Sequence, residues 1–96
     1  MMPLWRLRSG LFAGWKADDD QFYNAEGKHI GYLIGEIIYT NDGCAAGEVY
    51  GDQWIGRRKT VIYPTGKQQA ELGGKPAARL TDRAGLPLAG WADPDL

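Results

Sequence analysis

The chain has 96 residues, enough for one domain, and its 11 basic and 12 acidic side chains leave a formal net charge of −1. This balance excludes a global electrostatic attraction to nucleic acid or to an anionic membrane, so any charged site must be local. No apolar stretch approaches the ~18 residues of a membrane span, and a signal peptide is not expected. The one cysteine, Cys44, cannot form an internal disulfide, which favours a reducing compartment, the cytoplasm.

Glycines recur along the chain at a regular interval. The 14 glycines are about twice the usual share of ~7%. Residues 21–36 (QFYNAEGKHIGYLIGE) align with residues 37–52 (IIYTNDGCAAGEVYGD) at an offset of 16. One tyrosine pair and three glycine pairs are identical: Tyr23/Tyr39, Gly27/Gly43, Gly31/Gly47 and Gly35/Gly51.

The same interval extends in both directions. Upstream, with one residue inserted, residues 5–15 (WRLRSGLFAGW) place glycines opposite those of the next unit. Downstream the unit is degraded: Trp54 aligns with Phe22, but Lys59 stands where the turn glycine, Gly27, is expected. The sequence therefore contains about four related units.

Each unit is predicted to be a β-hairpin. The leading arm is β-branched and aromatic, as in residues 36–40 (EIIYT), and a polar turn ending in glycine follows it. The return arm carries a glycine in its middle, which indicates a bend, a bulge or a close approach of two backbones. A 16-residue hairpin cannot bury its own apolar face, so several must pack around a common axis.

These spacings, read as PLW…G…GW…FYN..G..IGY..G..IY..DG…G.V, resemble the four-fold β-flower domain of small bacterial proteins. The resemblance covers residues 3–66 and implies four short hairpins set around a pseudo-four-fold axis. It implies little chemistry, because that family has no settled biochemical function. We therefore expect an all-β repeat domain over residues 3–66.

Residues 67–96 form a Pro/Gly-rich extension with no clear period. They are expected either to be disordered or to form a docked partial hairpin. The second alternative is based on a sequence similarity within the chain: residues 83–91 (RAGLPLAGW) resemble residues 8–15 (RSGLFAGW) with one residue inserted. In that case Trp91 would dock on the core or on a second subunit.

A catalytic site is not expected. His29 is the one histidine and is predicted to be an exposed strand residue, without the partner ligands that a metal site needs. A thiol nucleophile at Cys44 would need His29 as its base, and the repeat places the two in neighbouring units without indicating contact. The acidic run at residues 18–20 lacks the spacing of a calcium loop. No metal and no cofactor are therefore predicted.

One basic cluster is present. Arg57, Arg58 and Lys59 follow Trp54 and precede Tyr63. Basic residues beside aromatic rings suit a phosphate backbone with stacked bases, but this cluster also falls at a predicted turn, where exposed charges are common. Both interpretations remain open.

The remaining candidate surface is aromatic. Most aromatic residues recur with the repeat and are expected in the core, but Trp15, Tyr32 and Trp91 are candidates for an interaction surface. The leading hypothesis is a non-catalytic module that binds a protein partner or another copy of itself. The first alternative is a nucleic-acid or anion-binding module, and the second is an enzyme that uses His29 and Cys44.

Overall fold

The fold consists of β-strands and extended connecting segments. The computed structural model of the chain describes residues 1–75 and 78–96. These residues contain strands and no helix, so the expected all-β class is confirmed. The strands are β1 (Met2–Arg6), β2 (Phe12–Lys16), β3 (Gln21–Asn24), β4 (His29–Ile34), β5 (Ile37–Thr40), β6 (Ala45–Tyr50), β7 (Trp54–Arg58) and β8 (Trp91–Ala92).

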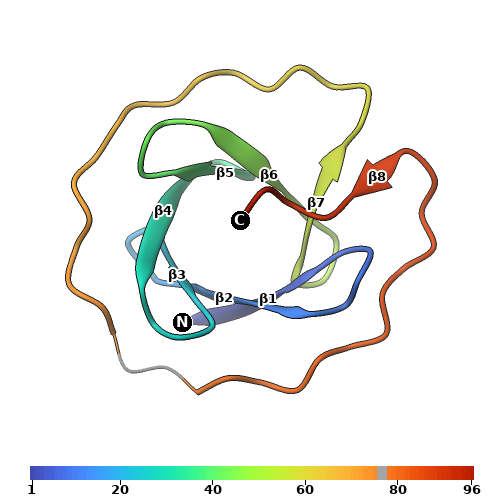
Figure 1. Cartoon of the computed structure of the whole chain (residues 1–96), viewed down its shortest axis with the longest axis horizontal. Helices are drawn as coiled ribbons and strands as arrows, with labels where there is room; N and C mark the ends of the chain where they lie inside the picture. The colour runs from blue at the N-terminus through green and yellow to red at the C-terminus, as the bar shows by residue number, and fades with distance from the viewer. Residues whose placement is uncertain (76–77) are drawn as a thin grey trace.

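Strands β1 to β7 close into a mixed barrel (Figure 1). Each pairs antiparallel with the next, and β1 then pairs in parallel with β7 through Trp5↔Trp54 and Arg6↔Ile55. Closure pairs both edges of the sheet, whose N–H and C=O groups would otherwise be free to bind another strand. The two-residue β8 lies outside the barrel and pairs antiparallel with the second half of β7.

The repeat corresponds to three bulged hairpins, β1–β2, β3–β4 and β5–β6. The leading strands shift register at equivalent places: between Leu4 and Trp5, Phe22 and Tyr23, and Ile38 and Tyr39. A Cβ atom on the glycine within each return strand would lie only 2.0 to 2.6 Å from a carbonyl oxygen of the next unit. These glycines are Gly14, Gly31 and Gly47. The bulge and the close approach expected from the sequence are therefore both present.

The fourth unit begins one residue later than the sequence alignment predicted. Ile55, and not Trp54, is fully buried in the barrel interior, as are Phe22 and Ile38 in the earlier hairpins. The reason is an inserted residue, because two residues separate β4 from β5 whereas three separate β6 from β7. Trp54 consequently lies on the outer face, where it packs against the cluster around Trp5.

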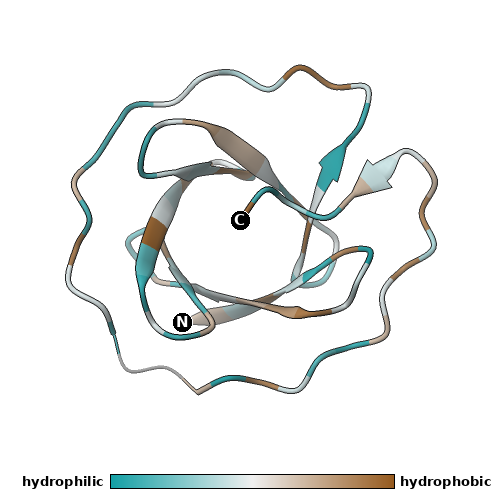
Figure 2. Cartoon of the chain, viewed as in Figure 1, coloured by the Kyte–Doolittle hydropathy of each residue, from teal (hydrophilic) through white to brown (hydrophobic). Residues whose placement is uncertain are grey.

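Residues 59–75 and 78–90 follow β7 and run around the outside of the barrel as an extended belt (Figure 1). In hydropathy the belt is mixed, with hydrophilic stretches along much of its course (Figure 2). Its backbone N–H groups donate to the carbonyl oxygens of the three repeated turn glycines. The bonds are Gly66 to Gly43 (2.8 Å), Lys75 to Gly27 (2.9 Å) and Arg83 to Gly10 (2.8 Å). The regular glycines are thus also the attachment points of the belt.

These turns require glycine for two reasons. Gly10, Gly27 and Gly43 have φ angles of 76°, 83° and 90°, which side-chain-bearing residues rarely adopt. In addition, a Cβ atom on Gly10 would lie 1.8 Å from the Arg83 carbonyl oxygen, and one on Gly43 would lie 2.7 Å from the Gly66 carbonyl oxygen. A side chain at either position would therefore push the belt away from the barrel.

The belt ends by returning to the barrel. Trp91 lies over Gly56, where an added Cβ atom would approach its ring to 2.8 Å, and it packs edge-on against Tyr50. Gly56 occupies the place that tyrosines hold in the second and third hairpins, so Trp91 supplies the ring which this unit lacks. Residues 94–96 then continue toward the barrel axis (Figure 1), and Leu96 packs against the interior cluster.

Candidate functional site

A cavity of about 340 Å³ opens at the end of the barrel to which residues 94–96 return. We call it the mouth cavity. The first two hairpin turns, the belt and residues 94–96 surround it. Its apolar lining residues are Leu11, Phe12, Ala13, Ala25, Ile30 and Leu96. Leu11 is 46% exposed, so the apolar lining reaches the surface. The volume lies at the lower end of the range typical of small-molecule sites.

Arg6 of β1 supplies a half-buried positive charge to this cavity. Its guanidinium donates to the main-chain oxygens of Pro94 and Leu96, and both distances are 3.4 Å. These bonds are longer than the usual 2.7–3.2 Å. Among residues 1–75 and 78–96, no Asp or Glu carboxylate lies within 4.0 Å of this guanidinium. Arg6 therefore has donor capacity that its surroundings use only weakly.

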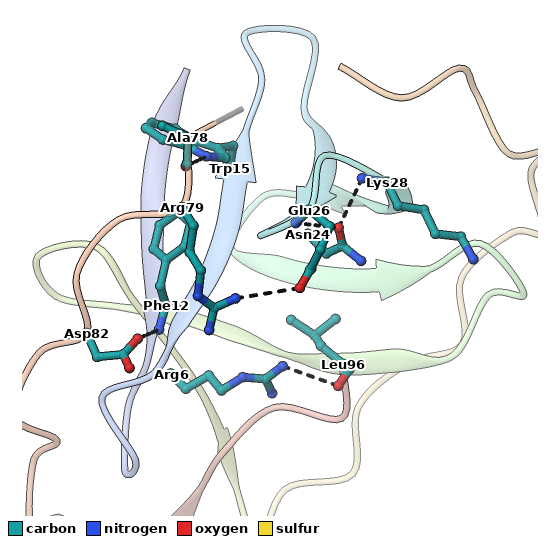
Figure 3. A network of polar contacts seen from close by, with 10 residues as sticks. All are labelled: Arg6, Phe12, Trp15, Asn24, Glu26, Lys28, Ala78, Arg79, Asp82 and Leu96. Carbon is teal, nitrogen blue, oxygen red and sulfur yellow. Dashed lines mark hydrogen bonds and ion pairs between the residues drawn. The ribbon is translucent and has the colours of Figure 1, made fainter. Parts of the chain in front are cut away.

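A second guanidinium comes from the belt. Arg79 lies 3.6 Å from the carboxylate of Glu26 in the β3–β4 turn, and both side chains are more than half exposed. Figure 3 shows Arg79 reaching toward Glu26, and Arg6 reaching toward Leu96. An exposed ion pair of this length contributes about 0–1 kcal/mol, so either partner can exchange it for another at little cost.

Asn24 adds an amide to the same cavity. Its Oδ1 accepts hydrogen bonds from the backbone N–H groups of Glu26 and Lys28, each at 3.0 Å (Figure 3). These two bonds fix the orientation of the amide. Within the described part of the chain its Nδ2 donates to no acceptor, and it is available to a ligand.

Two contacts hold the belt segment that carries Arg79 (Figure 3). The Trp15 indole donates to the carbonyl oxygen of Ala78 at 3.0 Å, and the Phe12 backbone N–H donates to the Asp82 carboxylate at 2.7 Å. Both donors belong to β2, so this strand sets where Arg79 enters the cavity.

His29 is completely buried, and the prediction of an exposed strand histidine was wrong. The belt covers it. Its Nδ1 accepts the backbone N–H of Leu72 at 2.9 Å, and its Nε2 lies 2.7 Å from Gln21 Oε1. With Nδ1 accepting this N–H, Nε2 is the ring nitrogen placed to donate to Gln21. Gln69 of the belt bonds to Gln21 and Asn41 in the same network.

The structure does not join His29 and Cys44 into a catalytic pair. Cys44 is exposed, whereas both ring nitrogens of His29 are occupied by other partners. No hydrogen bond links the two side chains among the bonds of the described residues.

The basic cluster is engaged in contacts within the chain. Arg58 pairs with the Glu48 carboxylate at 3.0 Å, and this bond raises the pKa of Arg58. Arg57 donates to the Ala45 carbonyl oxygen at 2.8 Å and lies 3.8 Å from the Asp95 carboxylate. Lys59 remains exposed.

The candidate aromatic surface faces the chain's own C-terminal segment. Tyr32 donates its hydroxyl to the Lys67 carbonyl oxygen, and the Trp15 indole bonds to the belt at Ala78. Trp91 is half-buried, and Arg58 lies 5.8 Å from its ring centroid. Trp54 is half-buried near the guanidinium of Arg83, which stacks 3.6 Å above the ring of Trp5.

Sequence reasoning missed the residues of the mouth cavity. Arg6 and Arg79 are far apart in the chain, and no motif surrounds either of them. The one local signal was Asn24, which the turn sequence NAEG identifies as a turn residue but not as part of a site.

Comparisons with known proteins identify no relative of this chain. No family model, no curated protein and no solved structure matches the chain. Across the described residues, no cluster of three or more His, Cys, Asp or Glu side chains could hold a metal ion. A search of the same residues for a helix long and apolar enough to cross a membrane found none.

Proposed function

We propose that this protein is a non-catalytic binding module and that the mouth cavity is its binding site. The observation that carries this proposal is the pairing of an apolar lining with Arg6, whose guanidinium makes only two long hydrogen bonds in the described structure. Ligand sites typically combine an apolar wall with a few polar groups that fix orientation. A location in the cytoplasm belongs to the same proposal.

The arrangement of the belt supports this choice of site over the aromatic surface. Trp15 and Tyr32 are tied to belt carbonyls, so a protein partner or a second copy could reach them only after displacing the belt. The mouth cavity is open without such a rearrangement.

An NMR titration of the whole chain tests the proposal. The probes are small molecules with a six-carbon chain and one polar end: hexanol, hexylamine and hexanoate. We expect amide shifts confined to cavity residues such as Ala13, Ala25 and Ile30, with Ile62, a remote and 97% exposed residue, unchanged. Shifts at Trp15 and Tyr32 instead, or no shift with any probe, would contradict the proposal.

Nucleic-acid or other anion binding through Trp54, Arg57, Arg58 and Lys59 is the competing proposal. The exposed Lys59 and the exposed guanidinium of Arg58 support it. It predicts that a short single-stranded oligonucleotide binds with an affinity that falls steeply with added salt. Lys59→Glu should then weaken binding, and an unchanged affinity would remove this alternative. An enzyme that uses His29 and Cys44 stays as the last alternative, and an activity that survives Cys44→Ala would remove it.

We also propose that the chain derives from a four-hairpin repeat like that of the β-flower domain, in which β7 and β8 stand for the fourth hairpin. The equivalent bulges of the first three hairpins support this origin. If the units are interchangeable, replacing the turn at residues 24–28 by the one at residues 40–44 should leave a folded protein. Loss of the cooperative thermal transition would argue against it.

A further inference from the structure

We infer that the mouth cavity takes a small monocarboxylate with an apolar tail. This inference rests on the proposed function, because it names the ligand class of the same site. The chemistry is set by three observations: the donors that converge on the cavity, the apolar wall beside them, and the acidic side chains at its rim.

The donors suit a carboxylate. Arg6 lies in β1 and Arg79 in the belt, and both line the cavity. Asn24 adds amide hydrogens that no acceptor uses in the described structure. A guanidinium presents a planar set of N–H donors that matches the two oxygens of a carboxylate. Arg79 is held only by an exposed ion pair with Glu26, so a ligand can take over that bond.

The apolar wall suits a hydrocarbon tail. Phe12, Ala13 and Ile30 line the cavity, and the exposed Leu11 extends this wall to the surface. Leu96 shows which combination this site accepts: its side chain packs against the interior cluster while its main-chain oxygen accepts a hydrogen bond from Arg6. A ligand with an oxygen acceptor and an adjacent apolar group would repeat both contacts.

The rim limits the charge of the ligand. Glu26 and Asp95 line the cavity together with Arg6 and Arg79, and the charge of Arg6 also acts on Asp93 outside the lining. A monoanion that displaces Glu26 from Arg79 adds one negative charge to this group, whereas a dianion adds two. A doubly charged phosphate would face both carboxylates and is disfavoured by like-charge repulsion.

The experiment compares four probes on the whole chain by NMR titration and calorimetry: hexanoate, hexanol, inorganic phosphate and N-acetylleucine. We expect hexanoate to bind about tenfold more tightly than hexanol, because one charge-assisted hydrogen-bond pair is worth about one decade in affinity. Inorganic phosphate is expected not to bind. The ligand could be the C-terminal end of a peptide or a free aliphatic acid, and N-acetylleucine distinguishes the two. If N-acetylleucine binds at least as tightly as hexanoate, the ligand is the carboxylate end of a peptide. If it binds more weakly, the ligand is a free aliphatic acid.

Three variants test the residue assignments. Arg79→Gln should weaken hexanoate about tenfold and leave hexanol unchanged, and Arg6→Gln should do the same if the chain remains folded. Glu26→Gln should tighten hexanoate binding several-fold, because it removes the competing carboxylate. Lys67→Gln, an exposed cation outside the cavity, is the matched control and should change nothing.

The outcomes separate the two proposals. Equal binding of hexanoate and hexanol, or tight binding of phosphate, would overturn the carboxylate assignment while the cavity remains a binding site. An unchanged or increased hexanoate affinity in Arg79→Gln would overturn the role of Arg79. If no probe shifts the cavity amides, both the ligand class and the proposed function fail.

Discussion

His29 shows how far one side chain can depart from its local sequence context. In the chain it stands between Lys28 and Ile30, yet the belt encloses it, and each of its ring nitrogens has a partner. A buried imidazole whose hydrogen bonds are complete links two parts of the chain, since the barrel supplies Gln21 and the belt supplies the Leu72 N–H.

We predict that His29→Ala lowers the free energy of unfolding by about 3 kcal/mol, because it leaves a cavity and an unpartnered Leu72 N–H. Urea denaturation measures the loss, and faster hydrogen exchange at the Leu72 amide locates it. Cys44→Ser, at an exposed position, is the control and should change stability by less than about 0.5 kcal/mol. An unchanged exchange rate at Leu72 would contradict the proposed contact.

Asp93 gives the stability of the fold a pH dependence. Burial of its carboxylate raises the pKa of Asp93, but the N–H groups of Ser9 and Arg8, helped by the charge of Arg6, lower it by more. The pKa is therefore lower in the folded than in the unfolded protein. The contribution is present above about pH 4 and is lost as the pH falls through the folded pKa.

We predict that Asp93→Asn destabilises the protein by about 1 kcal/mol at pH 7 and by less at pH 3, because the stabilising contribution is already being lost once the pH falls below the ordinary aspartate pKa of about 3.9. Urea denaturation at the two pH values measures both differences. Asp18→Asn, in the exposed acidic run, serves as the control. Equal differences at pH 7 and pH 3 would show that the charge of Asp93 does not matter.

In each of the first three hairpins, the same glycine allows the turn conformation and binds the belt. The turn glycines adopt positive φ angles, and their carbonyl oxygens accept hydrogen bonds from the belt. Gly35 also has a positive φ, of 60°, but nothing lies within 4 Å of its Cβ position. Substituting Gly35 therefore tests the cost of backbone strain alone, whereas substituting a glycine in a belt-contacting turn adds the loss of the belt contact.

We predict that Gly10→Ala costs at least about 2 kcal/mol more than Gly35→Ala. Both variants place alanine at a positive φ, which costs about 1 kcal/mol, but only Gly10→Ala collides with the Arg83 carbonyl oxygen. Chemical denaturation compares the two, and hydrogen exchange along residues 78–90 should rise in Gly10→Ala alone. Equal costs would show that the belt does not constrain this turn.

The whole molecule is a small barrel whose outer aromatic residues need a cover. Trp5, Phe12, Tyr23 and Tyr39 are all at most 7% exposed, and the belt passes over this face of the barrel. A domain of this size has a small interior core. The apolar side chains between the barrel and the belt therefore contribute a substantial part of its free energy of unfolding.

We predict that a chain ending at residue 62 loses cooperative thermal unfolding and binds a hydrophobic dye, because these aromatic side chains become exposed. Adding residues 63–96 as a separate peptide should restore the near-ultraviolet circular dichroism. Ile62→Ser in the full chain is the control, since that side chain is 97% exposed. A cooperative transition in the shortened chain would show that the barrel is stable alone.

The hairpins could be read from residues 5–52 because their determinants are local. A turn glycine at positive φ and a glycine beside a bulge act on their own backbone and on the neighbouring strand, so their spacing survives in the sequence. The same reasoning failed by one residue at Trp54, where the inserted turn residue alters the side of the strand that faces the interior.

The course of the belt could not be predicted, because it depends on contacts between segments far apart in the chain. No periodic pattern marks the belt, since its backbone bonds to the turn carbonyls do not depend on its own side chains. The burial of His29 and the presence of both Arg6 and Arg79 in the lining of one cavity follow from that course. Local backbone geometry therefore specified the repeated hairpins, whereas long-range docking of the belt created the buried network and the mouth cavity.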